Sequence, residues 1–248
     1  MNIFVSNDDG IKSKGLVVLA EKLAIKGNNV LVVAPSENRS ACSHSFTIGK
    51  GLKLLVEEVK GCSAYSITGT PADCVKFGKL VFKDFKADCV IAGINKGHNL
   101  GSDILYSGTV SIACEAAYFN NVAFAFSAFS LEDSNFELYS EYAIKIIDEL
   151  LPCSEPGDIW NINFPDDNVV GIKGVKITSL GKQLYSDRYE INQEGEYFLT
   201  GELMDYKDNP IDCDVEWVKK GYITVTPILF NKTNYQKLNL VKEKCIKL

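Results

Sequence analysis

The sequence is short of several features that common classes of protein require. Histidine occurs only twice in 248 residues, and none of the 8 cysteines forms a C-x-x-C pair. No apolar run approaches the length of a membrane span, and the N-terminus lacks the basic region and small-residue cleavage site of a signal peptide. We therefore interpret the scattered cysteines as buried free thiols and expect a cytoplasmic protein that has no membrane partner.

Motifs of the best-known nucleotide and hydrolase folds are also missing. No G-x-G-x-x-G follows the first predicted strand, and neither a Walker A loop nor a G-x-S-x-G nucleophile elbow is present. Aspartyl phosphatases often place Asp-x-Asp after their first strand, whereas the two aspartates here are adjacent. These absences argue against a dinucleotide-binding domain, a P-loop protein and a serine hydrolase.

The overall composition is that of an ordinary globular protein. Hydrophobic residues make up 46% of the chain and charged residues 23%, and the formal net charge is -6. This length suits one large domain, or one domain with an appendage. The negative charge argues against a nucleic-acid polymer as partner, but a bound metal can reverse the local field and allow a small anionic substrate.

The chain is organised around its first strand. Residues 1–5 predict a buried strand, because Ile3, Phe4 and Val5 leave no polar face, and Asn7-Asp8-Asp9-Gly10 ends it in a turn. A helix with apolar residues at helical spacing follows, Gly27 is its expected C-cap, and residues 29–35 form a second apolar strand. This βαβ unit predicts a parallel sheet with both aspartates at a strand's carboxyl end, where ligands bind in such sheets.

The rest of the chain extends the same alternation and then leaves it. Further strands are predicted at 45–48, 52–56, 64–67, 88–92, 121–127 and 158–162, and helices at 71–81, 110–119 and 136–151. After residue 165 the pattern becomes a polar β-hairpin, a returning strand and a terminal helix. We predict an α/β fold with a Rossmann-like core at 1–165, helices on both faces of a mainly parallel sheet, and a projecting hairpin and C-terminal helix at 166–248.

The adjacent carboxylates of Asp8 and Asp9 predict a metal site. Like charges at close range raise the pKa of one group unless a cation neutralises them, and carboxylate oxygens suit Mg²⁺, Mn²⁺ or Ca²⁺. Ser40 and Asn95 follow two other strands and would join them at the same sheet edge. The alternative is a purely polar turn, because short motifs of this kind are weak.

A second stretch, 93–110, predicts an anion site beside that metal. It is rich in glycine, and Ser107-Gly108-Thr109 begins the next helix, where backbone N–H groups and the helix dipole favour a phosphate. Long glycine-rich loops also occur for structural reasons alone. A cation next to a phosphate cradle suits phosphomonoester hydrolysis by a metal-activated water.

Several stretches, taken together, resemble the SurE family of stationary-phase survival proteins, which are metal-dependent 5′/3′-nucleotidases. They occur in the family's order and are Asn7-Asp8-Asp9-Gly10, Asn38-Arg39-Ser40, 69–75, Gly93-Ile94-Asn95 with Gly97, Asn99 and Gly101, 106–110, and 221–227. The chain departs from the family pattern at Ala92, Ser36-Glu37 and Ala41. None of these positions is a proposed metal ligand.

The resemblance implies the residues of the site. One divalent ion per subunit, Mg²⁺ or Mn²⁺, would be held by Asp8, Asp9, Ser40 and Asn95. The substrate phosphate would be bound by Asn7, Asn99, Ser107, Gly108 and Thr109, with Asp8, Asn95 and Ser107 in catalytic roles. Substrates would be nucleoside 5′- and 3′-monophosphates and short polyphosphate, and a C-terminal segment would be exchanged between subunits of a homodimer or homotetramer.

Two other functions stay open from the sequence alone. The same crevice would serve a non-catalytic nucleotide or phosphate sensor, and the hairpin would serve a protein that acts mainly through protein contacts. The general acid is not identified. His44 is a candidate only because it lies close to Ser40 in the sequence.

Overall fold

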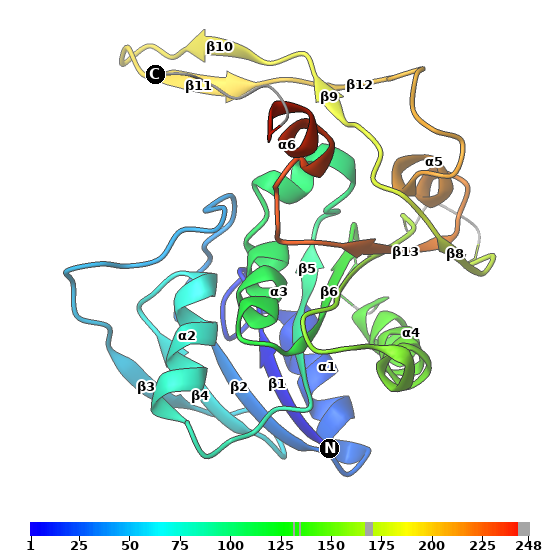
Figure 1. The fold of residues 1–248 in the computed structure, drawn as a ribbon. Helices are drawn as coiled ribbons and strands as arrows, with labels where there is room; N and C mark the ends of the chain where they lie inside the picture. Colours follow the sequence, from blue (N-terminus) through cyan, green and yellow to red (C-terminus); the bar gives the residue numbers. More distant parts are fainter. Residues whose placement is uncertain (131, 134, 167–170, 243–248) are drawn as a thin grey trace.

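The computed structural model describes residues 1–130, 132–133, 135–166 and 171–242. Within them, a nine-stranded sheet has the order β3-β4-β2-β1-β5-β6-β7-β13-β8 (Figure 1). In that order the strands span Leu54–Glu57, Ser63–Ile67, Asn29–Pro35, Asn2–Ser6, Cys89–Lys96, Val122–Ala128, Ile159–Phe164, Ile223–Ile228 and Val175–Ile177.

Two helices cover each face of this sheet. Helices α1 (Lys14–Ile25) and α4 (Asn135–Leu150) pack on one face, and α2 (Pro71–Val81) and α3 (Gly108–Tyr118) pack on the other. Successive strand side chains point to opposite faces, so Ile3 joins the α1–α4 core while Phe4 joins the α2–α3 core. This explains why the central strands are apolar throughout, and the predicted α/β fold with helices on both faces is confirmed.

The strand order reverses between β1 and β5. From β1 the chain moves outward to β2 and then β4, and from β5 it moves the other way to β6 and β7, all parallel to their neighbours. In open α/β sheets, ligands bind outside the carboxyl ends of the strands at such a reversal. The first strand therefore delivers residues 7–10 to the expected position.

The residues at the start of helix α2 determine where this helix begins. The Thr70 hydroxyl accepts from the Asp73 backbone N–H at 3.2 Å, and the Asp73 carboxylate accepts from the Thr70 N–H at 2.9 Å, so the two residues form a capping box. The Asp73 carboxylate also accepts from the Thr47 backbone N–H at 3.0 Å. Residues 45–48 consequently follow an irregular path, and the predicted strand there is wrong.

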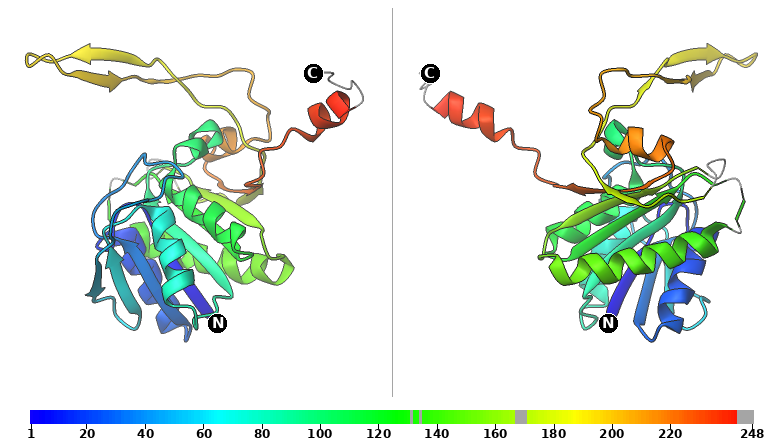
Figure 2. Two further views of the ribbon diagram at one scale, coloured as in Figure 1. Left: turned by 60° about the vertical axis from the view of Figure 1, so that its left-hand side comes forward. Right: turned by 90° about the vertical axis from the view of Figure 1, so that its right-hand side faces the viewer.

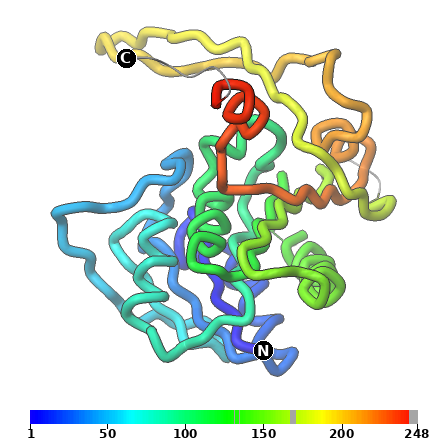
Figure 3. Tube along the Cα trace, viewed as in Figure 1, coloured from blue at the N-terminus to red at the C-terminus, as the bar shows by residue number. Residues whose placement is uncertain are grey.

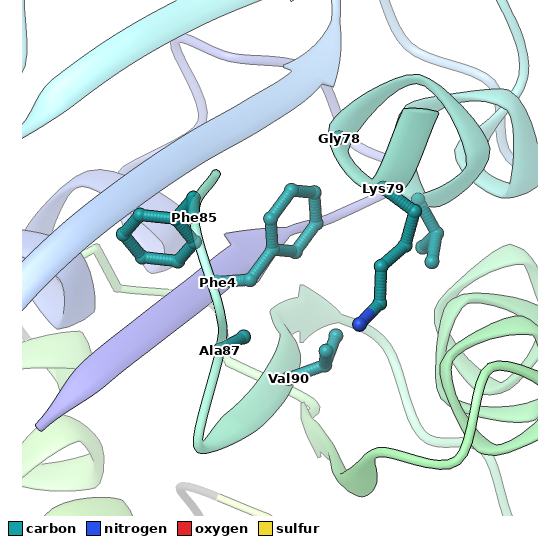
Figure 4. Close-up of a pocket in the computed structure, with 7 residues that line it drawn as sticks. Phe4, Gly78, Lys79, Phe85, Ala87 and Val90 are labelled. Atoms are coloured by element: carbon teal, nitrogen blue, oxygen red, sulfur yellow. The ribbon is translucent and has the colours of Figure 1, made fainter. Parts of the chain in front are cut away.

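Gly78 on the same helix allows a close approach to the sheet. A β-carbon at this position would lie 2.2 Å from the Phe4 ring. Beside this contact is a buried cavity of about 10 Å³, lined by Phe4, Val75, Lys79 and apolar neighbours (Figure 4). It is large enough for about one water molecule at most, so it is a packing gap rather than a ligand site.

The second part of the chain returns to the sheet and also leaves it. Strand β13 pairs antiparallel with β7, as the predicted returning strand requires, and β8 pairs parallel with β13. Strands β9 (Leu184–Tyr185), β10 (Arg188–Ile191), β11 (Tyr197–Thr200) and β12 (Leu203–Met204) form an arm, here called the hairpin arm. It projects from the core, and helix α6 (Tyr235–Lys242) projects in another direction (Figure 2).

Some sequence predictions extend beyond the described residues or are not settled by them. The predicted terminal helix at 234–247 is present as α6 to residue 242, and 243–247 lies outside the described residues. The division at residue 165 stays a prediction, since β8 and β13 belong to the same sheet as the first part. The seven cysteines at described positions are free thiols, and three of them are buried. No helix in the described ranges has the length and apolar character needed to span a bilayer.

Candidate active site

A cleft of about 830 Å³ opens at the carboxyl ends of the central strands. This volume is within the usual range for small-molecule sites. Five residues predicted from the sequence line it: Asp8, Ser40, Asn95, Asn99 and Ser107. They come from the ends of β1, β2 and β5 and from the start of α3, so the fold brings together segments that are far apart in the sequence.

Asp8 lies deepest in this group and contacts the start of helix α3. Its side chain is buried, and Oδ1 accepts a hydrogen bond from the Thr109 hydroxyl at 2.5 Å. A β-carbon on Gly108 would lie 2.7 Å from Asp8 Cβ and Oδ2, so only glycine permits this approach. The positive end of the α3 dipole therefore faces a carboxylate as well as the cleft.

Burial and a neighbouring charge both disfavour the ionised form of Asp8. The pKa of Asp8 is raised to about 6, mainly by burial. The hydrogen bond from the Thr109 hydroxyl lowers this pKa, whereas the nearby Asp9 carboxylate raises it. Burial also raises the pKa of Asp9, although the backbone N–H of Lys96 opposes this by donating to Asp9 Oδ2 at 3.0 Å. A pair of carboxylates in this condition favours a cation between or beside them.

The side-chain amide nitrogen of Asn95 is already engaged in a hydrogen bond. Its Nδ2 donates to the Gly97 carbonyl at 2.9 Å, which leaves the side-chain oxygen as the ligating atom available to the cleft. Strand β5 shifts register between Ala92 and Asn95, and this irregularity places Asn95 and Lys96 beside Asp9.

Ser40 is brought to the cleft by the loop after β2. The Arg39 backbone N–H donates to the Asp8 carbonyl at 2.7 Å and ties this loop to the first strand. The Ser40 backbone N–H and hydroxyl both donate to Asn38 Oδ1, at 2.7 and 2.6 Å. The lone pairs of the Ser40 oxygen are thus free to meet a cation.

Hydrogen bonds position Asn99 and Ser107 and leave a hydrogen-bond donor of each side chain available to the cleft. Asn99 donates to the Ser127 hydroxyl at 2.7 Å, and its backbone carbonyl accepts from Asn161 and Asn163. Ser107 is the N-cap of α3, and its hydroxyl oxygen accepts from the Val110 N–H at 3.0 Å. Its hydroxyl proton is still available to a phosphate oxygen.

The other four predicted residues do not line the cleft but support it. Asn7 donates to the Gly10 carbonyl at 2.9 Å and to the Ser13 hydroxyl at 2.5 Å, so it shapes the turn after β1. Thr109 is fully buried and directs its hydroxyl at Asp8. Gly108 supplies space, and Asp9 is held by the Lys96 N–H. Whether any of them contacts a substrate stays a prediction.

The donor set fits a hard divalent cation. Its members are two carboxylates, one hydroxyl and one amide oxygen, which is the chemistry that Mg²⁺ and Mn²⁺ prefer. Buried Asn7 Oδ1, next in sequence to Asp8, has no hydrogen-bond partner among the described atoms. The described residues contain no cluster of three or more His, Cys, Asp or Glu. The proposed set combines two carboxylates with two neutral oxygens and contains no histidine or cysteine, unlike a typical zinc site.

Sequence reasoning missed the opposite side of the cleft. This side carries Lys182, Gln183, Leu184, Tyr185, Asp187 and Leu199 from the hairpin arm and the segment before it. The sequence had indicated only protein contacts for this region. Tyr106 was missed too, although it directly precedes Ser107; it lines the cleft and is 66% exposed. It is a surface on which a planar group can stack.

Neither histidine lines the cleft. His44 Nε2 lies 2.9 Å from Glu115, within a separate hollow that also contains Lys76 and Tyr118. His98 Nε2 lies 2.7 Å from the Phe164 carbonyl, and burial lowers its pKa. The proximity of His44 to Ser40 in the sequence therefore does not bring its imidazole to the carboxylates.

Comparisons with known proteins agree with one another on the family. The family model described as Survival protein SurE matches residues 3–187. The 5'-nucleotidase SurE of Caldanaerobacter subterraneus subsp. tengcongensis is 42% identical, with 95% of this chain and 94% of that protein covered. The 5'-nucleotidase SurE of a Thermoanaerobacter species is 41% identical over the full length of both chains. The crystal structure of the SurE protein from Aquifex aeolicus superposes with a TM-score of 0.84 at 35% identity, covering 98% of each chain.

Proposed function

Because this chain belongs to the SurE family, we propose that it is a phosphomonoesterase that hydrolyses nucleoside 5′-monophosphates. The relatives' name, 5'-nucleotidase, supports this activity. One observation of the structure carries the proposal furthest. A buried carboxylate, Asp8, faces a cleft of nucleotide size at the sheet's reversal point, beside a second carboxylate and the start of a helix.

We propose that one divalent ion, Mg²⁺ or Mn²⁺, is held by Asp8, Asp9, Ser40 and Asn95. When bound, such an ion polarises a phosphoryl oxygen and lowers the pKa of a water molecule. The protein's part is to keep Asp8 in place through the Thr109 hydroxyl and Asp9 through the Lys96 N–H. It also supplies the ligating oxygens in a partly buried setting, where charge interactions are stronger than in water.

The phosphate is proposed to lie between the metal site and the start of α3. The hydroxyl proton of Ser107 and the amide of Asn99 are directed to the same cleft and would donate to phosphoryl oxygens. The first turn of α3 adds the positive end of its dipole, which favours the negative charge of the transferring group. These groups would hold the reacting phosphorus in line with its attacking and leaving oxygens.

The proton for the leaving oxygen is proposed to come from solvent. Both histidines lie away from the cleft, as their bonds to Glu115 and to the Phe164 carbonyl indicate. A covalent route through Asp8 is disfavoured because its carboxylate is engaged by Thr109 and packed against Gly108. Direct attack by water is therefore the simplest mechanism for this arrangement.

We also propose a range of substrates and a cellular location. The breadth of the cleft suits 3′-monophosphates and short polyphosphate as well as 5′-monophosphates. Free thiols support a cytoplasmic location, and the negative net charge argues against a nucleic-acid polymer as substrate.

We also propose that the chain forms a homodimer or homotetramer. Helix α6 buries none of its residues, and the hairpin arm exposes several large apolar side chains, among them Tyr189, Ile191, Tyr197 and Phe198. Two such apolar arms extending from one core are typical of surfaces covered by another subunit. Light scattering of the purified protein would give the subunit number, and a monomer would contradict the proposal.

The activity is tested by phosphate release from 5′-AMP, 5′-GMP and 3′-AMP with Mn²⁺, with Mg²⁺ and with EDTA. We expect release that needs a divalent metal and collapses in Asp8→Asn. Folded protein that binds phosphate but releases none with any metal would instead support a non-catalytic sensor. Release that survives both EDTA and Asp8→Asn would place the chemistry elsewhere in the chain.

A further inference from the structure

The hairpin side of the cleft is built around two aspartates that no metal proposal uses. The chain enters the hairpin arm through residues 181–185, here called the hairpin base. This base passes beside the 3-10 turn η1 (Gly101–Leu105), which connects β5 to α3 (Figures 2 and 3). Two carboxylates, Asp103 and Asp214, join these two segments.

Asp214 fixes the two backbones together. It is fully buried at the start of helix α5 (Asp214–Lys219). Its carboxylate accepts from the backbone N–H groups of Gly101 at 2.8 Å, Gly181 at 2.7 Å and Val215 at 2.9 Å. A β-carbon on Gly101 would lie 2.7 Å from the Gly181 carbonyl oxygen, so the two glycines permit this contact.

Asp103 fixes the side chains of the hairpin base. Its Oδ2 accepts from Gln183 Nε2 at 2.7 Å and from the Tyr185 hydroxyl at 2.6 Å. The adjacent Ser102 hydroxyl donates to the Gln183 carbonyl at 2.9 Å and accepts from the Gln183 N–H at 3.1 Å. Four hydrogen bonds thus hold two consecutive turn residues to the hairpin base.

The apolar part of the surface held in this way, here called the apolar wall, differs from the metal side of the cleft. Leu184, Tyr185 and Leu199 line it from the hairpin arm, and Leu105 and Tyr106 line it from the end of η1. Apolar and aromatic side chains of this kind bind planar, weakly polar groups, whereas the metal side presents oxygen ligands. The metal side therefore suits the phosphate of a nucleotide, and the apolar wall suits its nucleoside.

We propose that this apolar wall binds the nucleoside part of the substrate, and that Asp103 and Asp214 are the positioning residues that hold the wall in place. The inference rests on the proposed nucleotidase function, because it assigns the other half of the same cleft. Asp103 and Asp214 act through Tyr185, Gln183 and the backbone, not on the reacting atoms. Their loss therefore weakens binding of the nucleoside and leaves the chemical step alone.

The test compares 5′-AMP with ribose 5-phosphate, which has the same phosphate and sugar but no base. Tyr185→Phe removes one hydrogen bond to Asp103 and keeps the ring, and Asp103→Ala removes both bonds. We expect KM for AMP to rise about three- to tenfold in Tyr185→Phe and more in Asp103→Ala, with kcat within about twofold. KM for ribose 5-phosphate should not change.

Tyr189→Phe is the matched control. Tyr189 lies on β10 of the same arm, is 68% exposed and does not line the cleft. It should leave both substrates unaffected. An equal rise of KM for AMP and ribose 5-phosphate in Tyr185→Phe, or an unchanged KM for AMP in Asp103→Ala, would overturn the proposal.

Binding of adenosine, measured by calorimetry with the metal removed, separates this inference from the proposed function. Weaker adenosine binding in Tyr185→Phe than in wild type supports the apolar wall even if no phosphate is released from any substrate. Adenosine affinity that is the same in wild type, Tyr185→Phe and Asp103→Ala overturns it, whether or not AMP is hydrolysed.

Discussion

The metal side and the hairpin side of the cleft are held in place by different means. On the metal side, Asp8 and Asn95 lie at the carboxyl ends of two adjacent parallel strands, so the sheet itself sets their separation. On the hairpin side, Tyr185 and Leu184 reach the cleft only because Asp103 and Asp214 bind the hairpin base to η1. A site built on strand ends is rigid with the core, whereas the hairpin side depends on a few hydrogen bonds.

The same difference decides what each side can contribute. Ligands on rigid elements would hold a cation and phosphate to within fractions of an ångström, as the proposed hydrolysis requires. A wall held by a few hydrogen bonds can bind a nucleoside of variable shape without taking part in bond breaking. Changes on the metal side should therefore lower kcat, and changes on the hairpin side should raise KM.

The largest effect is expected from Asp9→Asn. Removing one of two charged ligands lowers both metal affinity and the stabilisation of phosphoryl charge, and kcat/KM for AMP should fall by about a thousandfold. Asp84→Asn, at an exposed carboxylate outside the cleft, should have no effect. Steady-state kinetics at saturating Mn²⁺ measures both, and near-normal activity in Asp9→Asn would remove Asp9 from the site.

A smaller effect is expected from Gly108→Ala. The added β-carbon would lie 2.7 Å from the Asp8 carboxylate and would displace it, so kcat should fall by about tenfold to a hundredfold. Gly51→Ala is the control, because no heavy atom lies within 4 Å of its β-carbon position. Comparable losses in the two variants would show that close packing at Asp8 is not the cause.

Asp8→Asn should make the metal-free protein more stable at neutral pH. The pKa of Asp8 is raised by burial from 3.8 to about 6, so the folded state binds its proton more tightly than the unfolded state. The resulting stability is complete below about pH 4 and is lost as the pH rises through about 6. At neutral pH the variant avoids this loss and should gain about 1–3 kcal/mol in the free energy of unfolding.

Urea unfolding in EDTA at several pH values measures this gain. The difference between Asp8→Asn and wild type should disappear as the pH approaches about 4. Wild type that is at least as stable as the variant at neutral pH would mean that Asp8 is not strained by burial.

The smallest effect is expected from His44→Gln. Its imidazole is bound to Glu115 in a hollow outside the cleft, so kcat for AMP should stay within about twofold of wild type across neutral pH. A pH–rate profile measures this. Loss of a basic limb that is present in wild type would indicate that His44 is the general acid.

The two sides also differ in how far the sequence predicts them. The apolar run before Asp8 and the helix pattern after Gly10 are local, and a parallel βαβ unit leaves one place for the carboxylates. The capping residues of α2 and α3 are local as well, and both caps form as the sequence indicates. These features were predictable because neighbouring residues decide them.

The hairpin side depends on contacts between distant residues. Asp103 meets Tyr185 across 82 positions, and Asp214 meets Gly101 across 113. Each residue alone resembles an ordinary polar surface residue, so no periodicity or short motif predicts the pairing. The predicted strand at 45–48 failed for a similar reason, because the Asp73 carboxylate bonds the Thr47 N–H.

Calorimetric titration of Mn²⁺ into the wild-type protein and Asp8→Asn at neutral pH would show directly whether the strand ends bind the cation. We expect one Mn²⁺ per wild-type chain and an affinity that falls by at least about a hundredfold in the variant, because one of only two charged ligands is lost. Equal stoichiometry and affinity in the two proteins would rule out Asp8 as a ligand, and the cation would then have to be bound outside the strand ends.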